Sequence, residues 1–289
     1  MYYEAKKDCF GLDAAAGAGG SPDKFFNAQL RRPAQEDAVD LPIIMYHEVK
    51  PAKAGKDAIL PSEFEQDLQY LASQGYTTVT ISQVIDYVNG NGSLPQKPIM
   101  LTFDDGYLNN YTYVLPLLQK YNAKIVFSVI GKCLDDFTAN PCSTAEYAYI
   151  TWSQLTEMMD TGLVEVQNHT YNLHAYNPRR RIGCTQAYGE SDWDYEALLT
   201  KDIGGLQTLI AQKTGQTPDA FAYPYGKRSD LTDPVLKKLG FEATLTCDYG
   251  ISAVSQSPEC LFGLKRIGRP HGQSLEVTLR EGFKTLKYR

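Results

Sequence analysis

Short apolar runs that indicate buried strands alternate with amphipathic, helix-type segments along most of this 289-residue chain. Gly75, Gly162 and Gly240 each end such a segment just before the next run, as helix-terminating glycines do. Ser62–Glu65 and Thr151–Gln154 match the capping boxes that begin helices. Strands alternating with helices form parallel sheets, and about eight strands predict an α/β fold, a (β/α) barrel. The expected strands are 42–46, 77–80, 98–103, 124–130, 163–167, 219–223, 242–246 and 264–267.

The alternation also indicates how the chain divides. Residues 1–40 show no clear periodicity and contain the small, flexible stretch 14–22, which is typical of an extension or linker. From residue 41 onward strand-type and helix-type segments alternate, interrupted by one long non-periodic segment over 175–192. We therefore expect an N-terminal extension over 1–40 and a single domain over 41–289.

Composition excludes some classes of protein. Apolar residues make up 43% of the chain and charged residues 21%, which is ordinary for a soluble globular protein. A net charge of −6 implies no general affinity for nucleic acid or anionic membranes. No apolar run approaches the length of about 20 residues that a membrane-spanning helix needs. We expect a monomer with no nucleic-acid partner and no transmembrane segment.

The six cysteines allow two interpretations. Cys133 and Cys142 flank one polar loop, and Cys247 and Cys260 flank another, so both spacings suit loop-closing disulfides. The alternative is six unpaired thiols in a cytosolic enzyme. No two cysteines form a CxxC pair, which argues against a structural zinc site. Residues 1–5 do not resemble a signal peptide, so secretion would require that a leader had been removed.

Carboxylates and histidines follow two of the predicted strands. Asp104 and Asp105 end the third strand, and Gly106 lets the chain turn away sharply. His169 and His174, two of only four histidines, follow the fifth strand. Singly, each motif is typical of a turn or a structural residue. Because functional residues of a barrel meet at the carboxyl ends of its strands, together they predict a three-ligand metal site with an open position. The second aspartate is then a candidate general base.

These residues also belong to a longer series of motifs. Thr102–Gly106, His169–His174 and Phe221–Gly226 resemble the polysaccharide deacetylases, the NodB-homology group of carbohydrate esterase family 4. Leu41–Val49 and Trp152–Leu163 resemble further signatures of that family, so the resemblance covers most of the chain. It implies a distorted, often incomplete (β/α) barrel, here of about seven to eight parallel strands.

The resemblance implies a metal site made of Asp105, His169 and His174. One carboxylate oxygen and two imidazoles suit Zn²⁺, and also Co²⁺, Ni²⁺ or Mn²⁺; the ligand set does not select among them, and zinc is the metal we expect. The two histidines are five residues apart, whereas four is the commonest spacing in the family. Residues five apart do not share a helical face, so this segment is expected to be a loop or to carry a bulge.

The other catalytic roles follow from the same resemblance. Asp104 would be the general base that takes a proton from the activated water. The backbone N–H of Tyr225 would help to hold the oxyanion. For the general acid we favour His47, at the end of the first strand, with His271 as the alternative. A structural reading of His47, as a residue that orients a loop, also stays open.

The chain departs from the family pattern in the third motif and in the last. Ala222 stands where an arginine often orients the catalytic aspartate, and Arg266 is a candidate replacement from the last strand. The late motif, Leu264–Ile267, carries no histidine. Residues 175–192 form a long non-periodic segment that could wall the site, and its Arg179–Arg181 run is either a solvated loop or a contact for glycan or anions.

The expected function is therefore a metal-dependent hydrolase that removes N-acetyl or O-acetyl groups from a polysaccharide. Peptidoglycan, chitin-like polymers, poly-N-acetylglucosamine and acetyl-xylan all remain open as substrates, and the expected location is extracellular or at the cell surface, acting on cell-wall or related carbohydrate. The alternative is a catalytically silent member of the same fold that binds glycan or metal. A serine-esterase GxSxG elbow and a metalloprotease HExxH motif are both missing from the sequence.

Overall fold

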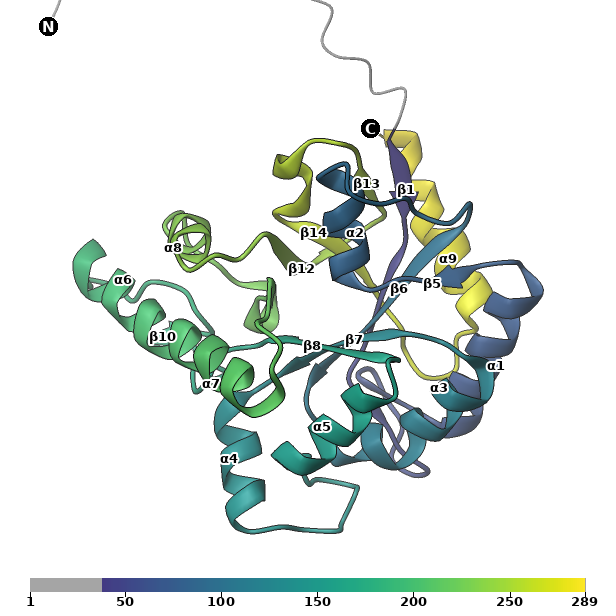
Figure 1. Ribbon diagram of the computed structural model, residues 1–289, viewed down its shortest axis with the longest axis horizontal. Helices are drawn as coiled ribbons and strands as arrows, with labels where there is room; N and C mark the ends of the chain where they lie inside the picture. Colours follow the sequence, from purple (N-terminus) through teal and green to yellow (C-terminus); the bar gives the residue numbers. More distant parts are fainter. Residues whose placement is uncertain (1–37, 289) are drawn as a thin grey trace, which may run out of the picture. The chain divides into compact units, whose positions relative to one another are not determined.

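The computed structural model describes residues 38–288, and a closed barrel of parallel strands lies at its centre (Figure 1). Seven strands follow one another around it, and the pairing of the first with the last closes it. A further short strand, β5 (Thr77–Thr78), pairs with the start of β6. The seven, in spatial order, are β2 (Ile43–Tyr46), β14 (Leu264–Gly268), β12 (Ala243–Tyr249), β11 (Ala220–Ala222), β8 (Val164–Asn168), β7 (Ile125–Val129) and β6 (Pro98–Asp105).

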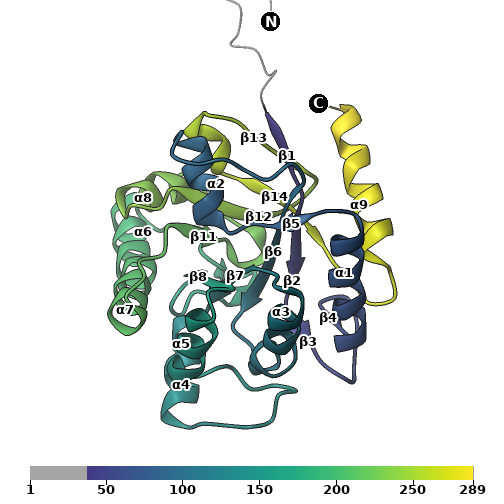
Figure 2. The same ribbon diagram turned by 45° about the vertical axis from the view of Figure 1, so that its right-hand side comes forward.

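All eight strands predicted from the apolar runs are present, and the predicted α/β barrel is confirmed. Helices lie around the outside of the barrel (Figures 1 and 2). They are α1 (Pro61–Ser73), α2 (Ile81–Val88), α3 (Leu115–Tyr121), α4 (Gly131–Ala139), α5 (Trp152–Asp160), α6 (Asp192–Leu199), α7 (Gly205–Thr214), α8 (Thr232–Lys238) and α9 (Leu275–Lys284). Two π-helical turns, Asn110–Val114 and Thr200–Gly204, lead into α3 and α7.

The helix ends follow the sequence signals with one exception. Thr151 caps α5 and Gln154 completes the capping box as predicted, and Gly75, Gly162 and Gly240 follow their helices with φ of 72°, 70° and 89°. The box predicted at Ser62–Glu65 is wrong, because Pro61 already occupies the first helical turn. Glu63 instead accepts the Leu60 N–H at 2.8 Å.

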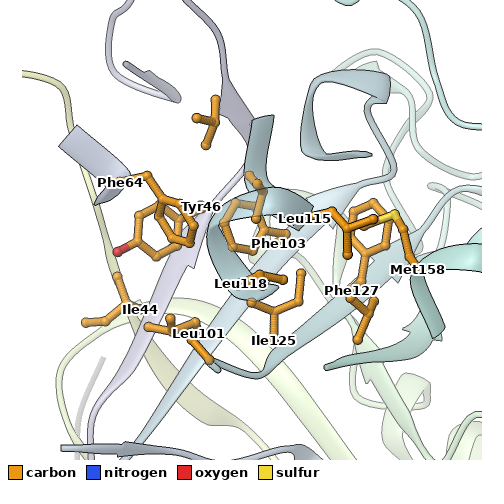
Figure 3. Packing of buried hydrophobic residues seen from close by; sticks show 14 of the residues in the cluster. Ile44, Tyr46, Phe64, Leu101, Phe103, Leu115, Leu118, Ile125, Phe127 and Met158 are labelled. Atoms are coloured by element: carbon orange, nitrogen blue, oxygen red, sulfur yellow. The ribbon is translucent and has the colours of Figure 1, made fainter. Parts of the chain in front are cut away.

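Side chains alternate between the two faces of each strand and so build two cores. Leu101 and Phe103 point outward from β6 into the layer between barrel and helices, where the Phe103 ring stacks on Tyr46 at 4.9 Å (Figure 3). Thr102 and Asp104, the alternate residues of β6, therefore face the interior of the barrel. The N-terminal end of the barrel is closed by α2, whose apolar side chains pack with the inward-facing residues of β2, β6 and β12. The opposite end is therefore the one available for a site.

Three pairs of short strands complete the structure. β1 (Val39–Leu41) pairs with β13 (Ser252–Val254), and β3 (Glu48–Val49) pairs with β4 (Ala58–Ile59). β9 (Tyr176–Asn177) and β10 (Arg181–Ile182) form a hairpin inside the predicted non-periodic segment 175–192. The extension predicted over 1–40 lies almost wholly outside the described residues. Among the helices described, none is both long and apolar enough to cross a membrane.

The disulfides suggested by the cysteine spacing are wrong for the described residues. Cys133, Cys142, Cys247 and Cys260 are all free thiols, as is Cys184. Their sulfur atoms contact other groups instead. The Cys142 sulfur lies 3.5 Å from the Tyr147 hydroxyl, and the Cys260 sulfur lies 3.6 Å from the Ser255 carbonyl oxygen. Cys9 lies outside the described residues.

Candidate metal centre and active site

Asp105, His169 and His174 come together at the carboxyl end of the barrel. Register brings the first two close, because Asp105 pairs with Val129 of β7 and Val129 pairs with Asn168, the residue before His169. The Asp105 Oδ1 atom lies 3.5 Å from His169 Nε2 and 3.3 Å from His174 Nε2. One ligand atom from each of the three residues lies within 4.8 Å of the others. This is the trio that the sequence predicted as metal ligands.

The chemistry of these three atoms fits a cation. His169 Nδ1 donates to the Ala222 carbonyl oxygen at 2.8 Å, so its Nε2 carries a lone pair directed at the cluster. Asp105 Oδ1 is buried and has no hydrogen-bond partner among the described residues. Buried polar atoms normally have a partner, so an orphaned carboxylate oxygen facing imidazole lone pairs marks a place where a positive ion would supply it.

The protonation states of these residues suit ligation as well. Burial lowers the pKa of His174 to about 4, helped by the neighbouring His169, so its imidazole is neutral at pH 7. Burial would raise the pKa of Asp105, but the adjacent histidines, His169 above all, outweigh burial and hold that pKa below its ordinary value. Burial would lower the pKa of His169, but Asp105 and Asp104 outweigh burial and raise that pKa. At neutral pH the cluster thus contains an ionised carboxylate and, in His174, a neutral imidazole, and a cation bound here would take the place of a proton on His169.

The backbone at the site adopts strained conformations that aim these side chains. Asp105, Thr170 and Tyr225 have φ values of 77°, 73° and 59°, in the left-handed region that non-glycine residues rarely occupy. The segment from His169 to His174 is a loop, as the five-residue spacing predicted. Asp202 fixes this loop, because its carboxylate accepts hydrogen bonds from the backbone N–H groups of Tyr171 and Asn172, at 2.8 and 2.9 Å.

Asp104 is held by a buried arginine. Two nitrogens of Arg266 contact its two carboxylate oxygens at 2.9 and 2.8 Å, and both side chains are almost fully buried. Arg266 in turn donates to the Thr246 carbonyl oxygen at 2.7 Å. Burial alone would raise the pKa of Asp104, but the guanidinium charge outweighs it and holds the carboxyl well below its usual range. The structure thus places Arg266 where the sequence suggested a replacement for the arginine missing at Ala222.

The two candidate acids occupy different surroundings. His47 follows β2 and is half-buried, and its charge is one of the contributions that lower the pKa of both Asp104 and Asp105. His271 instead places its Nδ1 2.6 Å from Glu63 at the start of α1. The structure therefore brings His47, and not His271, together with the two carboxylates.

Tyr225 lies beside the candidate metal ligand His174, in a tight turn, Pro224–Gly226. Its hydroxyl is 3.3 Å from His174 Nδ1, and its ring centroid is 4.7 Å from that of His174. The sequence assigned only the backbone N–H of Tyr225 to the site. The contact of its side chain with a metal ligand was not predicted.

Two further supports of the site were missed from the sequence. Asn110, fully buried, donates to the His47 carbonyl oxygen at 3.0 Å, and Asp202 holds the histidine loop as described above. Each comes from a π-helical turn far along the chain from the residue it fixes. Such turns often mark functional sites, but nothing in the local sequence signals them.

An α/β barrel with an Asp-His-His cluster that could hold a metal ion at the carboxyl ends of its strands is an arrangement that hydrolytic enzymes use. The sequence matches the polysaccharide deacetylase family over residues 91–244, more than half of the chain. This protein therefore belongs to the polysaccharide deacetylase family. The matched region includes Asp104, Asp105, His169 and His174, whereas His47 and Arg266 lie outside it.

Curated relatives carry more specific names. A poly-β-1,6-N-acetyl-D-glucosamine N-deacetylase of Escherichia coli (strain K12) is 28% identical over 233 residues, which are 74% of this chain and 34% of that protein. An enzyme of the same name from Staphylococcus aureus (strain MSSA476) is 26% identical over 196 residues, 68% of this chain and 61% of its own length. The chain thus spans about a third of the length of the first relative.

Solved structures have the same fold. The de-N-acetylase of Aggregatibacter actinomycetemcomitans superimposes with a TM-score of 0.72 at 26% identity, over 84% of this chain and 99% of that one. The deacetylase PplD of Streptococcus pyogenes, solved in complex with acetate, gives a TM-score of 0.67 at 27% identity over 85% and 98%. Both matches cover nearly the whole of the solved chain, so the barrel described above has the fold of these two deacetylases.

Proposed function

We propose that this protein is a metal-dependent deacetylase that removes N-acetyl groups from an N-acetylglucosamine polysaccharide. The proposal rests on one observation: the Asp105–His169–His174 cluster and the Asp104 carboxylate, which contacts Arg266, lie next to each other at the same end of the barrel. The names of the curated relatives support an amide of poly-N-acetylglucosamine over the acetyl esters of xylan. Such polymers lie outside the cytoplasm, so we also propose action at the cell surface or beyond it.

Asp105, His169 and His174 would hold the metal ion, Zn²⁺ most readily, with Co²⁺, Ni²⁺ or Mn²⁺ as alternatives. A divalent cation supplies two things to such a reaction: water that loses a proton near neutral pH, and a positive charge that polarises the acetyl carbonyl. The hydrogen bond from His169 to Ala222 fixes the ring and, in the neutral imidazole, places the proton on Nδ1, so that Nε2 is the nitrogen that can ligate.

Asp104 is suited to accept the proton of the attacking water. Its carboxylate is ionised at neutral pH because Arg266 outweighs the effect of burial on its pKa. The bidentate contact also fixes the orientation of the carboxylate, which an acid–base group needs.

Two groups would complete the reaction around the substrate. The backbone N–H of Tyr225 would donate to the oxygen of the attacked carbonyl as negative charge develops there. His47 would give a proton to the nitrogen of the leaving amine, so that the C–N bond breaks to acetate and a free amino group. Asn110 would keep His47 in place through the His47 carbonyl.

Acetate release from an N-acetylglucosamine pentamer tests the proposal. The protein is assayed as purified, after chelation, and after Zn²⁺ or Co²⁺ is added back, with the Asp104→Asn variant alongside. We expect release that chelation removes and metal restores, and that Asp104→Asn lowers by a factor of about a thousand or more. Asp194→Asn, in α6 and remote from these contacts, serves as the control substitution.

Two results would overturn parts of the proposal. Release that is insensitive to complete removal of metal would refute the metal dependence. Metal binding without release from the pentamer, peptidoglycan or acetyl-xylan would favour the silent binding protein. Ala222 and the missing late histidine motivated that alternative, but Arg266 already contacts Asp104 as an orienting arginine would.

A further inference from the structure

The hairpin formed by β9 and β10 is firmly attached to the turn that carries Tyr225. Gly183, at the foot of the hairpin, approaches Pro224 so closely that a Cβ there would lie 2.9 Å from the proline Cβ and carbonyl oxygen. Beyond it, the Cys184 thiol donates to the Lys227 carbonyl oxygen at 3.3 Å, and the Gln186 N–H donates to Ser229 Oγ at 2.9 Å. The hairpin and the Pro224–Gly226 turn therefore form one rigid unit at the mouth of the site.

Arg181 stabilises this unit from within. Its guanidinium contacts Glu190 at 2.5 Å and lies over the Tyr195 ring, 5.9 Å from the ring centroid. Arg181 is therefore occupied by the hairpin's own structure. Of the arginine run that the sequence offered as a glycan or anion contact, only Arg179 and Arg180 are exposed.

One aromatic ring of this rigid unit has been left open to solvent. Tyr176 is 63% exposed, although its ring lies edge-to-face with Tyr225, with centroids 5.4 Å apart and planes at 75°. Tyr225 is 38% exposed and packs on the metal ligand His174. The three rings form a continuous row from the ligand cluster outward. Exposed aromatic surface that is fixed in place beside a site, with polar groups around it, marks where a ligand packs.

We propose that Tyr176 and Tyr225 form a stacking platform for a sugar ring of the substrate, next to the residue that loses its acetyl group. The proposal rests on the function proposed above. Pyranose rings present a face of C–H groups that packs on an aromatic ring. A platform beside the ligand cluster recognises a polymer rather than a single sugar. Tyr176 would therefore set the preference for chain length without touching the reacting atoms.

The test compares KM and kcat for N-acetylglucosamine oligomers of increasing length. In the wild type KM should fall as the oligomer grows from dimer to pentamer. Tyr176→Ala should raise KM for the pentamer about three- to tenfold, the loss expected for one aromatic stacking contact, with the effect on KM rather than kcat. Tyr176→Phe, which keeps the ring, should restore the wild-type KM. Tyr188→Ala is the matched control, because Tyr188 is a tyrosine of the same segment that is fully exposed and, among the described residues, makes no ring contact.

The outcomes separate this proposal from the function on which it rests. If the wild type releases acetate but Tyr176→Ala keeps the wild-type dependence of KM on length, the platform is refuted and the function stands. If the wild type releases no acetate, calorimetric binding of the pentamer decides: weaker binding by Tyr176→Ala than by Tyr188→Ala upholds the platform. Equal binding by the two variants, or no binding by the wild type, overturns it.

Discussion

The contact between Arg266 and Asp104 joins two strands, because Arg266 lies on β14 and Asp104 on β6. Arg266 is the largest fully buried side chain, and it reaches Asp104 from β14. Ala222 on β11 belongs to the same inward-facing layer as other small side chains, Ala220 and Ala243 among them. These alanines leave room for a guanidinium inside the barrel, so position 222 does not need to supply one itself.

Removing Arg266 should therefore disable the site and weaken the fold. Arg266→Ala leaves Asp104 buried without a counter-charge, which we expect to cost about 3–5 kcal/mol of unfolding free energy and to lower the rate of acetate release at least about a hundredfold. The double variant Arg266→Ala with Ala222→Arg should recover part of the unfolding free energy and part of the rate, because the new arginine on β11 can reach the space that the Arg266 guanidinium leaves.

Denaturant unfolding and acetate release measure these effects, with Arg280→Ala as the control because Arg280 is an exposed arginine of α9. If folded Arg266→Ala turned over at the wild-type rate, orientation of Asp104 by Arg266 would be refuted.

The sequence predicted the candidate metal ligands and catalytic residues, but not the residues that fix the backbone around them. Asp105, His169 and His174 stand in short motifs directly after apolar strands, so their meeting follows from the parallel barrel. Asp202 and Asn110 act on backbone groups 31 and 63 residues away. Their contacts depend on how distant turns pack, and no local pattern records that.

Among the elements, the end of the barrel remote from the site carries two partly buried carboxylates, Glu165 and Asp219. Glu165 of β8 accepts the Ile81 N–H at the start of α2, at 3.0 Å, and Ser82 donates to Asp219 at 3.2 Å. Burial, and then the charge of Glu165, raise the pKa of Asp219 to about 6. These hydrogen bonds cap α2 at the closed end of the barrel, but they keep the carboxylates of Glu165 and Asp219 near one another, which disfavours the ionised form of Asp219.

Asp219 should therefore make stability depend on pH. Its pKa is about 6 in the folded protein and near 3.9 in the unfolded chain, so the folded state binds the proton more tightly. The contribution of protonated Asp219 to the unfolding free energy is therefore complete below about pH 4 and is lost as the pH rises through about 6. Asp219→Asn, which mimics the protonated form, should raise the unfolding free energy at pH 7.5 by about 1–3 kcal/mol and leave it unchanged at pH 3.5.

Urea unfolding at both pH values tests this, with Asp230→Asn as an exposed control. A gain that is equal at both pH values would show that the titration of Asp219 is not its cause.

The elements themselves were predictable where periodicity was strong. The eight apolar runs are long enough to indicate strands, and Thr151 with Gln154 marks a helix start unambiguously. The start of α1 was misplaced because Pro61, ahead of the apparent capping box, already fits the first turn. The hairpin of β9 and β10 was missed because strands of two residues have no periodicity to detect.

The molecule as a whole depends on contacts between strands that are distant in the sequence. The barrel closes where Ile43–Tyr46 of β2 pair with Met100–Phe103 of β6, and that closure aligns the strand ends that carry Asp104 and His47. The sequence predicted seven to eight parallel strands but not that seven close the barrel while β5 remains a short partner of β6. That outcome follows from strand tilt and register, which the sequence does not display.

The central claim is that this barrel end holds one metal ion on Asp105, His169 and His174, with Asp104 beside the ion rather than bound to it. The most direct test is the metal content per chain of the wild type, Asp104→Asn and His169→Ala after dialysis against Zn²⁺. We predict one ion in the wild type, one in Asp104→Asn and none in His169→Ala, with circular dichroism confirming that all three are folded. A full equivalent of zinc in folded His169→Ala, or none in the wild type, would contradict the account.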